Sequence, residues 1–451
     1  MSSAESVSPL WIVASATNPS GVIGGGSQSA RNLLIGLREG GLDFTLVTQA
    51  LSAESSATRV ESEFGPGLRL GLPTPSRWAE PTTVATIRRL LAEHRPRLIH
   101  LLEPMGQLGA WIEAGREYPA PLVYTALDYN WLCVHAHLIT RRGVPCPGPH
   151  SSLDCLQCHF DHREPLARLG LKVARAIAVL PRSMRPPRLA SAAEAWSRES
   201  TVTPERLAAL PADFARLDAL IAPSKALADR FVANGFPRRK VHHVPYGTRP
   251  GTRIPLADRP PLSDGVVVGF AGRLEFDKGA DQLLDSLAEI RRTTPHRPRL
   301  VVYAGASSTG FNRGIRGRMA SAAFRDWTTL AQFDGRDPAA LDSVHRGLHV
   351  FAAPSRWTDN LPNSVLEALE RRTPVVAPDQ GSFVEMIEHG CNGWLYPSHE
   401  PNALTNLLRT IVGEPQRHLD MPFDVVRTRT PAAEAADVRS IYTALGWTDP
   451  S

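Results

Sequence analysis

Two cations lie at a strand-to-helix turn in the second half of the chain. Arg273 follows Gly272 at the end of the apolar run 265–271, and Lys278 precedes Gly279 five residues later. An arginine offers a bidentate fork and a lysine a point charge, so the pair suits an anion such as phosphate. Only four of the 50 basic residues are lysines, which makes a lysine at this turn informative. The alternative is a pair of solvated surface cations.

A second motif spans residues 354–369, PSRWTDNLPNSVLEAL. Pro362 suits the first turn of a helix, and Asn360 suits its N-cap. The amide N–H groups of Asn363 and Ser364 would then have no partner inside the helix. The motif therefore predicts a second place where backbone donors meet a phosphate.

Two carboxylates flank that turn. Asp359 lies just before the expected helix and Glu367 more than one turn inside it, roughly 12 Å apart by helix rise. This separation is too long for an acid–base pair and suits a grip on two ends of one ligand, such as a sugar and a ribose. A capping Asp and an exposed Glu are the alternative.

A glycine-rich turn at 21–26, GVIGGG, follows an apolar run at 10–15. Its amides can approach an anion at the start of the helix expected at 27–39. The pattern is not G-x-G-x-x-G, and no acidic residue follows the next strand at Thr48 and Gln49, which disfavours a dinucleotide site. A tight strand-to-helix turn is the alternative.

Four of the five cysteines fall within one segment with the spacing C-x12-C-x8-C-x2-C: Cys133, Cys146, Cys155 and Cys158. Thiolates at such spacing suit a tetrahedral structural zinc, and a histidine nearby (His135, His150 or His159) could replace one ligand. Free thiols, or a redox-labile pair at Cys155 and Cys158, are the alternatives.

The elements that must position these motifs alternate between apolar runs and helical periodicity, which is typical of parallel sheets with helices on both faces. In the first half we expect strands near 10–15, 44–47, 97–101, 121–126 and 219–222, and helices near 27–39, 83–91, 106–114, 191–216 (broken at Pro211) and 225–234. In the second half we expect strands near 265–271, 300–304, 327–332, 349–352 and 374–377, and helices near 279–291, 338–346, 361–371, 383–389, 401–412 and 432–445.

The length of 451 residues suits two doubly wound Rossmann-like α/β domains that face a cleft. We expect an N-terminal domain at 1–247, with a cysteine-rich loop at 131–162 and a basic insertion at 163–216. A Pro-rich linker at 248–263 leads to a C-terminal domain at 264–430, and a last helix at 431–451 packs back on the first domain.

Composition excludes several classes of protein. Hydrophobic residues make up 42% and charged residues 21%, so the chain is not disordered, and a net charge of +5 does not indicate a nucleic-acid binder. No apolar run is long enough for a membrane span, and the first residues lack the basic region of a secretory signal. We therefore expect a cytoplasmic protein.

The stretch 163–188 is basic with apolar residues between the charges. As an amphipathic helix it could lie on the inner surface of an anionic membrane and meet a lipid-linked acceptor. An arginine-rich solvated face is the alternative, because prolines end any helix there early.

Together these motifs resemble family 4 of the retaining glycosyltransferases, which have the GT-B fold. The likeness runs from about residue 10 to 412 and is most specific over 265–396, with RLEFDKG and the segment from PSRWTDN to NGWLY. A subset of the family also has cysteines shortly after a D-Y-x-W stretch, as this chain has after 128–131.

The resemblance implies roles for the motif residues. Arg273 and Lys278 would hold the donor diphosphate, Asp359 the donor sugar hydroxyls and Glu367 the ribose; the family more often has Glu at the position of Asp359. The other residues implied at the donor are Gly25, Gly26, Gly272, Arg336, Asn360, Leu361 and Ser364.

One departure from the family concerns the reacting centre. The family often has a His directly before the Asp that follows the strand, and this chain has Leu127 before Asp128 and Tyr129. His100, which ends the preceding strand, is expected to take its place on the acceptor side with Asp128 and Tyr129. His135 and His137 are the other candidates.

The implied reaction is transfer of a sugar from a nucleotide-diphosphate sugar to an acceptor hydroxyl, with attack on the face that the diphosphate leaves. The acceptor would be a saccharide, a lipid-linked glycan or a small natural product. No cofactor is required for this role. A non-catalytic or partner-dependent nucleotide-sugar-binding homologue is the main alternative, and an epimerase or phosphorylase on the same fold is another.

Overall fold

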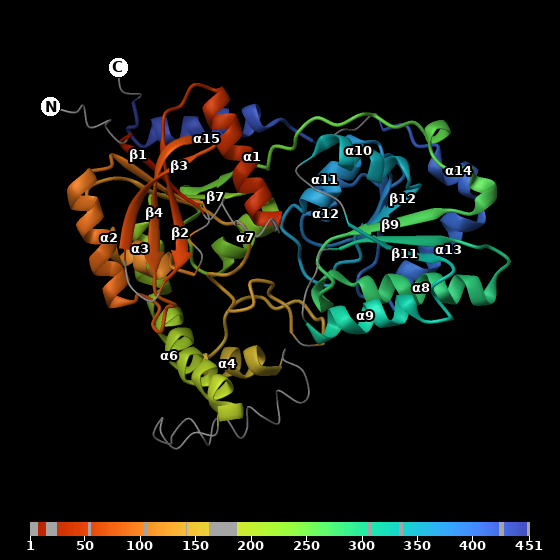
Figure 1. The fold of residues 1–451 in the computed structure, drawn as a ribbon, viewed down its shortest axis with the longest axis horizontal. Coiled ribbons are helices and arrows are strands. Elements are labelled where there is room, and N and C mark those ends of the chain that lie inside the picture. The colour runs from red at the N-terminus through yellow and green to blue at the C-terminus, as the bar shows by residue number, and fades with distance from the viewer. Residues whose placement is uncertain are drawn as a thin grey trace.

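Short runs of three to eight residues, most of them buried and aliphatic, form the strands of two sheets. The computed structural model describes residues 8–14, 25–52, 56–102, 104, 106–140, 142–161, 187–304, 309–332, 337–423 and 428–448. In this part of the chain two α/β units lie side by side, each with helices on both faces of its sheet (Figure 1). The alternation in the sequence therefore predicted the architecture correctly.

The first sheet has the strand order β3-β4-β2-β1-β5-β6-β7-β8. All neighbours pair in parallel except β3 and β4, which form an antiparallel edge. The strands are β1 (Leu10–Val13), β2 (Thr45–Leu51), β3 (Ser56–Ser62), β4 (Gly65–Leu72), β5 (Leu98–Leu101), β6 (Leu122–Thr125), β7 (Ala219–Ala222) and β8 (Val241–His243).

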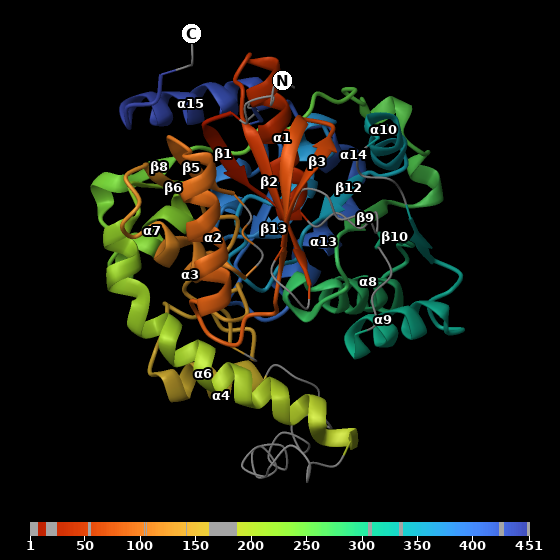
Figure 2. The same cartoon turned by 60° about the vertical axis from the view of Figure 1, so that its left-hand side comes forward.

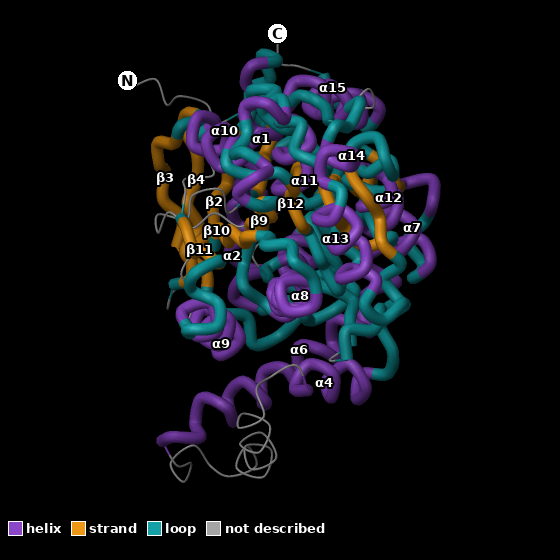
Figure 3. Tube along the Cα trace, turned by 90° about the vertical axis from the view of Figure 1, so that its right-hand side faces the viewer, coloured by secondary structure: helices purple, strands orange, loops and turns teal. Residues whose placement is uncertain are grey.

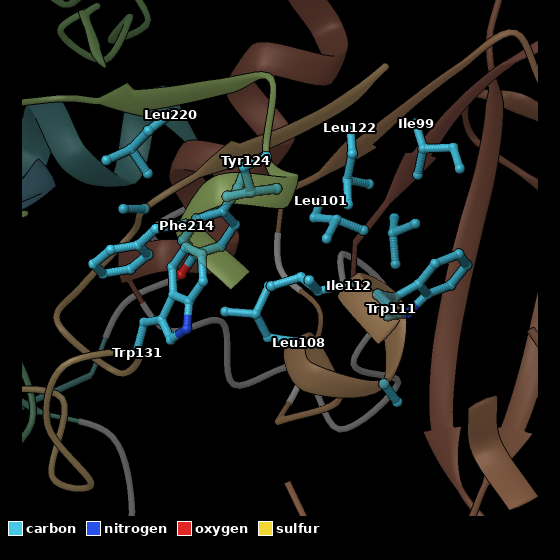
Figure 4. Close-up of a cluster of buried hydrophobic side chains, with 14 of the residues drawn as sticks. Ile99, Leu101, Leu108, Trp111, Ile112, Leu122, Tyr124, Trp131, Phe214 and Leu220 are labelled. Carbon is cyan, nitrogen blue, oxygen red and sulfur yellow. The ribbon is translucent and has the colours of Figure 1, made fainter. Parts of the chain in front are cut away.

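Two apolar clusters cover this sheet. On one face the core includes side chains from α2 (Pro81–His94), α3 (Leu108–Ala114), α7 (Lys225–Ala233) and the end of α6 (Pro187–Arg216). Trp131 packs there edge-on against Phe214 and Tyr124 (Figure 4). On the other face lie α1 (Gly25–Glu39) and α15 (Pro431–Ala444).

The second sheet is entirely parallel, with the order β11-β10-β9-β12-β13-β14. Its strands are β9 (Val267–Ala271), β10 (Arg299–Tyr303), β11 (Thr328–Ala331), β12 (Val350–Ala352), β13 (Val375–Pro378) and β14 (Gly393–Tyr396). One face packs against α8 (Ala280–Thr293), α9 (Gly310–Ala320) and α13 (Ala403–Gly413). The other packs against α10 (Pro338–Arg346), α11 (Asn363–Glu370) and α12 (Phe383–Met386).

Shorter helices complete the chain: the α-helices α4 (Ser152–Asp161) and α14 (Pro415–Leu419), and the 3-10 turns η2 (Arg238–Lys240), η3 (Leu256–Asp258), η4 (Leu262–Asp264) and η5 (Phe276–Lys278). Helices α4 and α6 project together from one end of the molecule (Figure 3).

The last helix returns to the first unit, as expected. Helix α15 lies along α1 (Figure 2). Gly36 permits the contact, because a Cβ there would lie 2.3 Å from the Pro431 carbonyl oxygen. At the crossing, Gly247 N donates to the buried Glu434 carboxylate at 2.7 Å and Asn32 Nδ2 donates to the Gly247 oxygen at 3.1 Å.

Several local expectations were wrong or incomplete, and the elements β8, α4, α9, β14 and α14 were not expected. The hairpin of β3 and β4 was not expected, because β3 is a polar, largely exposed edge strand and β4 carries three glycines and a proline. The break expected at Pro211 does not occur, and α6 continues through Pro204 and Pro211. Buried Leu210 and Phe214 pack on both sides of Pro211 and hold the helical path.

Most of the basic stretch expected to form an amphipathic helix, and Arg336, lie outside the described residues. Within the described part of the chain, no helix combines the length and apolarity that crossing a membrane requires.

The turn between η5 and α8 requires glycine. Gly279 has φ 72°, and a Cβ there would lie 1.9 Å from the Pro354 carbonyl oxygen. The left-handed backbone and this close approach both exclude a side chain. The turn fixes Lys278 at the start of α8.

We predict that Gly279→Ala lowers the free energy of unfolding by at least about 2 kcal/mol, because it adds both backbone strain and a clash. Gly314→Ala is the matched control: Gly314 lies exposed in α9 with open space around its Cα. That change should be neutral or stabilise by about 0.5–1 kcal/mol. Urea unfolding of both variants measures the difference, and equal stabilities would contradict the account.

Candidate active site

Charged side chains gather where the carboxyl ends of the two sheets meet. Arg273 lies exposed after β9, and Lys278 ends η5. Lys278 Nζ lies 2.6 Å from Asp359 Oδ2, and it also lies over the Trp357 ring, 4.8 Å from its centroid. The structure therefore pairs Lys278 with Asp359, two of the residues predicted to act on one ligand.

The turn before α11 differs from the expected cap. Asn360 does not cap the helix, which begins at Asn363 with no side-chain cap. Asn360 N donates to Asp359 Oδ1 at 2.9 Å, and Leu361 N donates to Ser382 Oγ at 2.7 Å. Leu361 has a left-handed φ of 56°. The amides of Asn360 and Leu361 are thus used within the protein rather than left free for a phosphate.

The start of α11 faces the start of α1. Asn363 Nδ2 donates to the Gly25 carbonyl oxygen at 2.7 Å and to Ser29 Oγ at 2.8 Å. Gly25 is exposed, while Gly26 and Ser364 are half-buried. The N-termini of two helices, both favourable for an anion, are therefore within one hydrogen bond of each other.

Glu367 lies half-buried on α11, beyond the first turn. Burial raises the pKa of its carboxyl to about 7, although the Arg371 and Arg249 guanidinium groups act in the opposite direction. The group therefore titrates near neutrality.

Asn360 connects the two units. Its Nδ2 donates to the carbonyl oxygens of Ala126 at 3.3 Å and Leu127 at 2.9 Å, and its Oδ1 accepts from Ser224 Oγ at 2.9 Å. All four residues are buried or half-buried. The side chain expected at a helix cap therefore holds the end of β6 and the start of α7.

A second connection comes from Glu385 on α12. Its carboxylate accepts from Lys225 N and Ala226 N, both at 2.9 Å, and so caps α7 of the other unit. His243 Nε2 lies 3.7 Å from the same carboxylate. Sequence reasoning missed Glu385 and Ser224, because no local pattern indicates an acid that caps a helix 160 residues away.

A tryptophan of the second unit completes the contact. Trp357 packs within the apolar core of the first sheet, and Tyr129 lies edge-on to it with centroids 6.1 Å apart. Leu127 packs against apolar clusters of both units. Tyr129 is fully buried and Asp128 is half-buried, so Asp128 is the more accessible of the two.

His100 does not lie where the acceptor side was expected. The ring is fully buried within the first unit, with Nδ1 2.6 Å from Tyr442 Oη and Nε2 2.7 Å from Thr125 Oγ1. Burial lowers the pKa of its imidazole to about 3. Because β5 is a central strand, the side chain at its end packs under α15 rather than at the interface of the two units.

The cysteines of the expected metal site lie in the loop between β6 and α4 and in α4 itself. Cys133, Cys146, Cys155 and Cys158 are half-buried, and none of them is in a disulfide in the described chain. Cys146 Sγ donates to the Gly148 carbonyl oxygen at 3.1 Å. Among the residues that the structure describes, no group of three or more His, Cys, Asp or Glu is arranged to hold a metal ion. Structural zinc therefore stays a prediction from the spacing alone.

Comparisons with known proteins agree with this geometry. Residues 24–247 match the family model described as "Glycosyl transferase 4-like domain", and residues 257–421 match "Glycosyl transferases group 1". The sucrose-phosphate synthase structure from Thermosynechococcus elongatus is similar with a TM-score of 0.64, at 18% identity over 97% of this chain and 99% of that chain. Anabaena HepE in complex with UDP and glucose has a TM-score of 0.62, at 15% identity over 97% and 100%.

Curated relatives match over shorter stretches. The D-inositol 3-phosphate glycosyltransferase of Jonesia denitrificans is 31% identical over 180 residues, which are 37% of this chain and 39% of the relative. The enzyme of the same name from Nocardia farcinica is 28% identical over 240 residues, or 49% and 52%. The chain thus spans about two fifths to one half of the length of these relatives.

We predict that Glu385→Ala weakens the contact between the two units. The variant leaves the first N–H groups of α7 without their acceptor, which costs about 1–2 kcal/mol of stability. Small-angle X-ray scattering should show a larger radius of gyration than for the wild type. Glu400→Ala, at an exposed carboxylate of the same unit, is the control and should match the wild type. An unchanged radius in Glu385→Ala would contradict the capping role.

Proposed function

Because the chain belongs to the family 4 glycosyltransferases of GT-B fold, we propose that it moves a sugar from a nucleotide-diphosphate donor to an acceptor hydroxyl with retention of configuration. The observation that carries this proposal is the cluster of Lys278, Asp359 and Arg273 beside the facing N-termini of α1 and α11. The cluster offers cations, a sugar-binding carboxylate and backbone donors in one place.

In this proposal each charge has one partner on the donor. Arg273 and Lys278 bind the diphosphate, Asp359 accepts from sugar hydroxyls and Glu367 accepts from the ribose. The pair of Lys278 and Asp359 supports this arrangement, because the lysine holds the carboxylate next to the phosphate it neutralises. HepE, a protein of the same fold, was crystallised with UDP and glucose, which makes UDP-glucose the first donor to test.

The proposed chemistry needs little from the protein beyond position and charge. The acceptor oxygen bonds to the anomeric carbon as the bond from that carbon to the diphosphate oxygen breaks. The acceptor proton passes to the departing phosphate oxygen on the same face. Arg273 and Lys278 stabilise the charge that develops there, in the way preorganised cations lower such barriers.

The acceptor would bind on the first unit, next to half-buried Asp128. The curated relatives are named for inositol 3-phosphate, so a phosphorylated polyol joins saccharides and lipid-linked glycans among the acceptors to test. A homologue that binds nucleotide-sugar without turnover is the second candidate. It is favoured by Leu127, which packs between the units and cannot bond a sugar hydroxyl.

We predict that the wild type releases nucleotide from one nucleotide-sugar and that Lys278→Ala lowers kcat/KM for that release by about 10²–10³-fold. Arg292→Ala is the control, since Arg292 lies on the outer end of α8 and pairs only with Glu289 in the described chain. Nucleotide release is measured by a coupled assay, and the configuration of the transferred sugar by NMR. An inverted product would contradict retention. Donor binding with no nucleotide release in the presence of any acceptor would favour the non-catalytic nucleotide-sugar-binding homologue.

Because the pKa of Glu367 is raised, we predict that donor affinity decreases on the acidic side of its pH profile, which we call the acidic limb. A ribose-binding carboxylate must be ionised, so donor affinity should rise as pH increases through about 7. Glu367→Gln should bind more weakly and lose this limb, because the amide does not titrate. Titration of donor affinity against pH measures both, and an acidic limb that persists in Glu367→Gln would assign it to another group.

A further inference from the structure

A loop of the first unit reaches the cations of the second. The segment between β6 and α4 is folded on itself: Ala136 N donates to the Cys133 oxygen at 2.9 Å, and Cys146 N donates to the Leu138 oxygen at 2.7 Å. At Gly143 the same loop touches Arg356, whose Cδ would lie 3.3 Å from an added Cβ. These contacts place His137, between Ala136 and Leu138, at the junction of the two units.

His137 lies beside the residues assigned to the donor diphosphate. Its ring is edge-on to Trp357 with centroids 4.6 Å apart, on the same indole that Lys278 covers. His137 Nε2 lies 3.8 Å from Asp277 Oδ2. That carboxylate oxygen is buried and has no hydrogen-bond partner in the described chain. After a small movement, a protonated His137 ring could donate a hydrogen bond to this oxygen.

The charges around His137 come from both elements of the second unit that it faces. Burial lowers the pKa of its imidazole, and the Lys278 and Arg273 cations lower it further, while Asp277 and Asp359 oppose them. Burial is the largest of these effects, so it favours the neutral ring. An added dianion would reverse this balance, because nearby negative charge favours the protonated ring.

We propose that His137 takes up a proton from solvent when the nucleotide-diphosphate sugar binds. It then serves as a third cation at the diphosphate, held by Asp277. This inference rests on the proposed function, since it requires the diphosphate to lie against Arg273 and Lys278. The cysteine-rich loop thereby contributes a donor-binding side chain, and the first unit senses an occupied donor site.

Proton uptake makes donor binding weaken as pH rises. Between the pKa of His137 in the free protein and its higher pKa in the complex, affinity should fall by up to about tenfold per pH unit, and above the pKa in the complex it should level off. Donor affinity should therefore fall at high pH because of His137 (the alkaline limb) and at low pH because of Glu367. It should have a maximum between these two ranges. The diphosphate of a nucleotide-sugar lacks a terminal phosphate and keeps its charge over this range, so the protein alone titrates.

The test is calorimetric titration of the full chain with UDP-glucose, or with whichever nucleotide-sugar a thermal-shift panel selects, between about pH 6 and 8.5. The titration is repeated in buffers of different ionisation enthalpy, and the change in observed binding enthalpy gives the number of protons taken up. We expect the wild type to take up about half to one proton per donor on the alkaline limb, and no net proton at the affinity maximum, where uptake by His137 balances release by Glu367. His137→Gln should take up none through this group, lose the alkaline limb and bind about 10-fold more weakly.

His399→Gln is the control, because His399 is an exposed imidazole of the second unit and lies outside this loop. It should keep both the uptake and the limb. Asp277→Asn is a second variant that keeps the shape of the buried side chain. By removing a carboxylate that favours the charged ring, it should shift the alkaline limb to lower pH.

The outcomes separate the two proposals. If no nucleotide-sugar binds, the proposed function fails. If one binds and His137→Gln keeps the wild-type proton uptake and alkaline limb, the inference about His137 is wrong while the donor site stands. Loss of uptake in His399→Gln with retention in His137→Gln would also overturn it.

Discussion

The burial of Trp357 is the contact on which the site depends. This side chain belongs to the motif of the second unit, yet it packs in the apolar core of the first. One face of the indole meets Lys278, and its other neighbours are Tyr129 and His137. Because a large aromatic ring excludes water, the pair of Lys278 and Asp359 lies where charges interact more strongly than at a surface.

Polar contacts around Trp357 set the orientation of the two units. Asn360 binds two carbonyl oxygens after β6, Glu385 caps α7, and Asn363 reaches the start of α1. The chain crosses between the units at Gly247, whose N–H donates to Glu434 of α15. Burial raises the pKa of Glu434 to about 8, so the crossing holds a carboxyl that is partly neutral at physiological pH.

Periodicity and turn chemistry predicted much of this fold, and physical reasons explain the rest. Buried parallel strands such as β9 are continuous apolar runs, so the sequence indicates them directly. Strand β3 is polar on an edge and carries no such signal. Arg273, Lys278 and Asp359 were predictable as a group because strand ends converge at one edge of a sheet. Glu385 and Trp357 act on partners of the other unit, and His100 is buried by a helix from the far end of the chain, so only the three-dimensional structure could place them.

The central claim is that the donor diphosphate binds between Arg273 and Lys278. A crystal structure of the full chain with the bound nucleotide-sugar would test it most directly. The account predicts both phosphates within hydrogen-bond distance of these two side chains, the ribose hydroxyls at Glu367 and the sugar at Asp359. A nucleotide bound elsewhere, with Lys278 still paired only to Asp359, would contradict it.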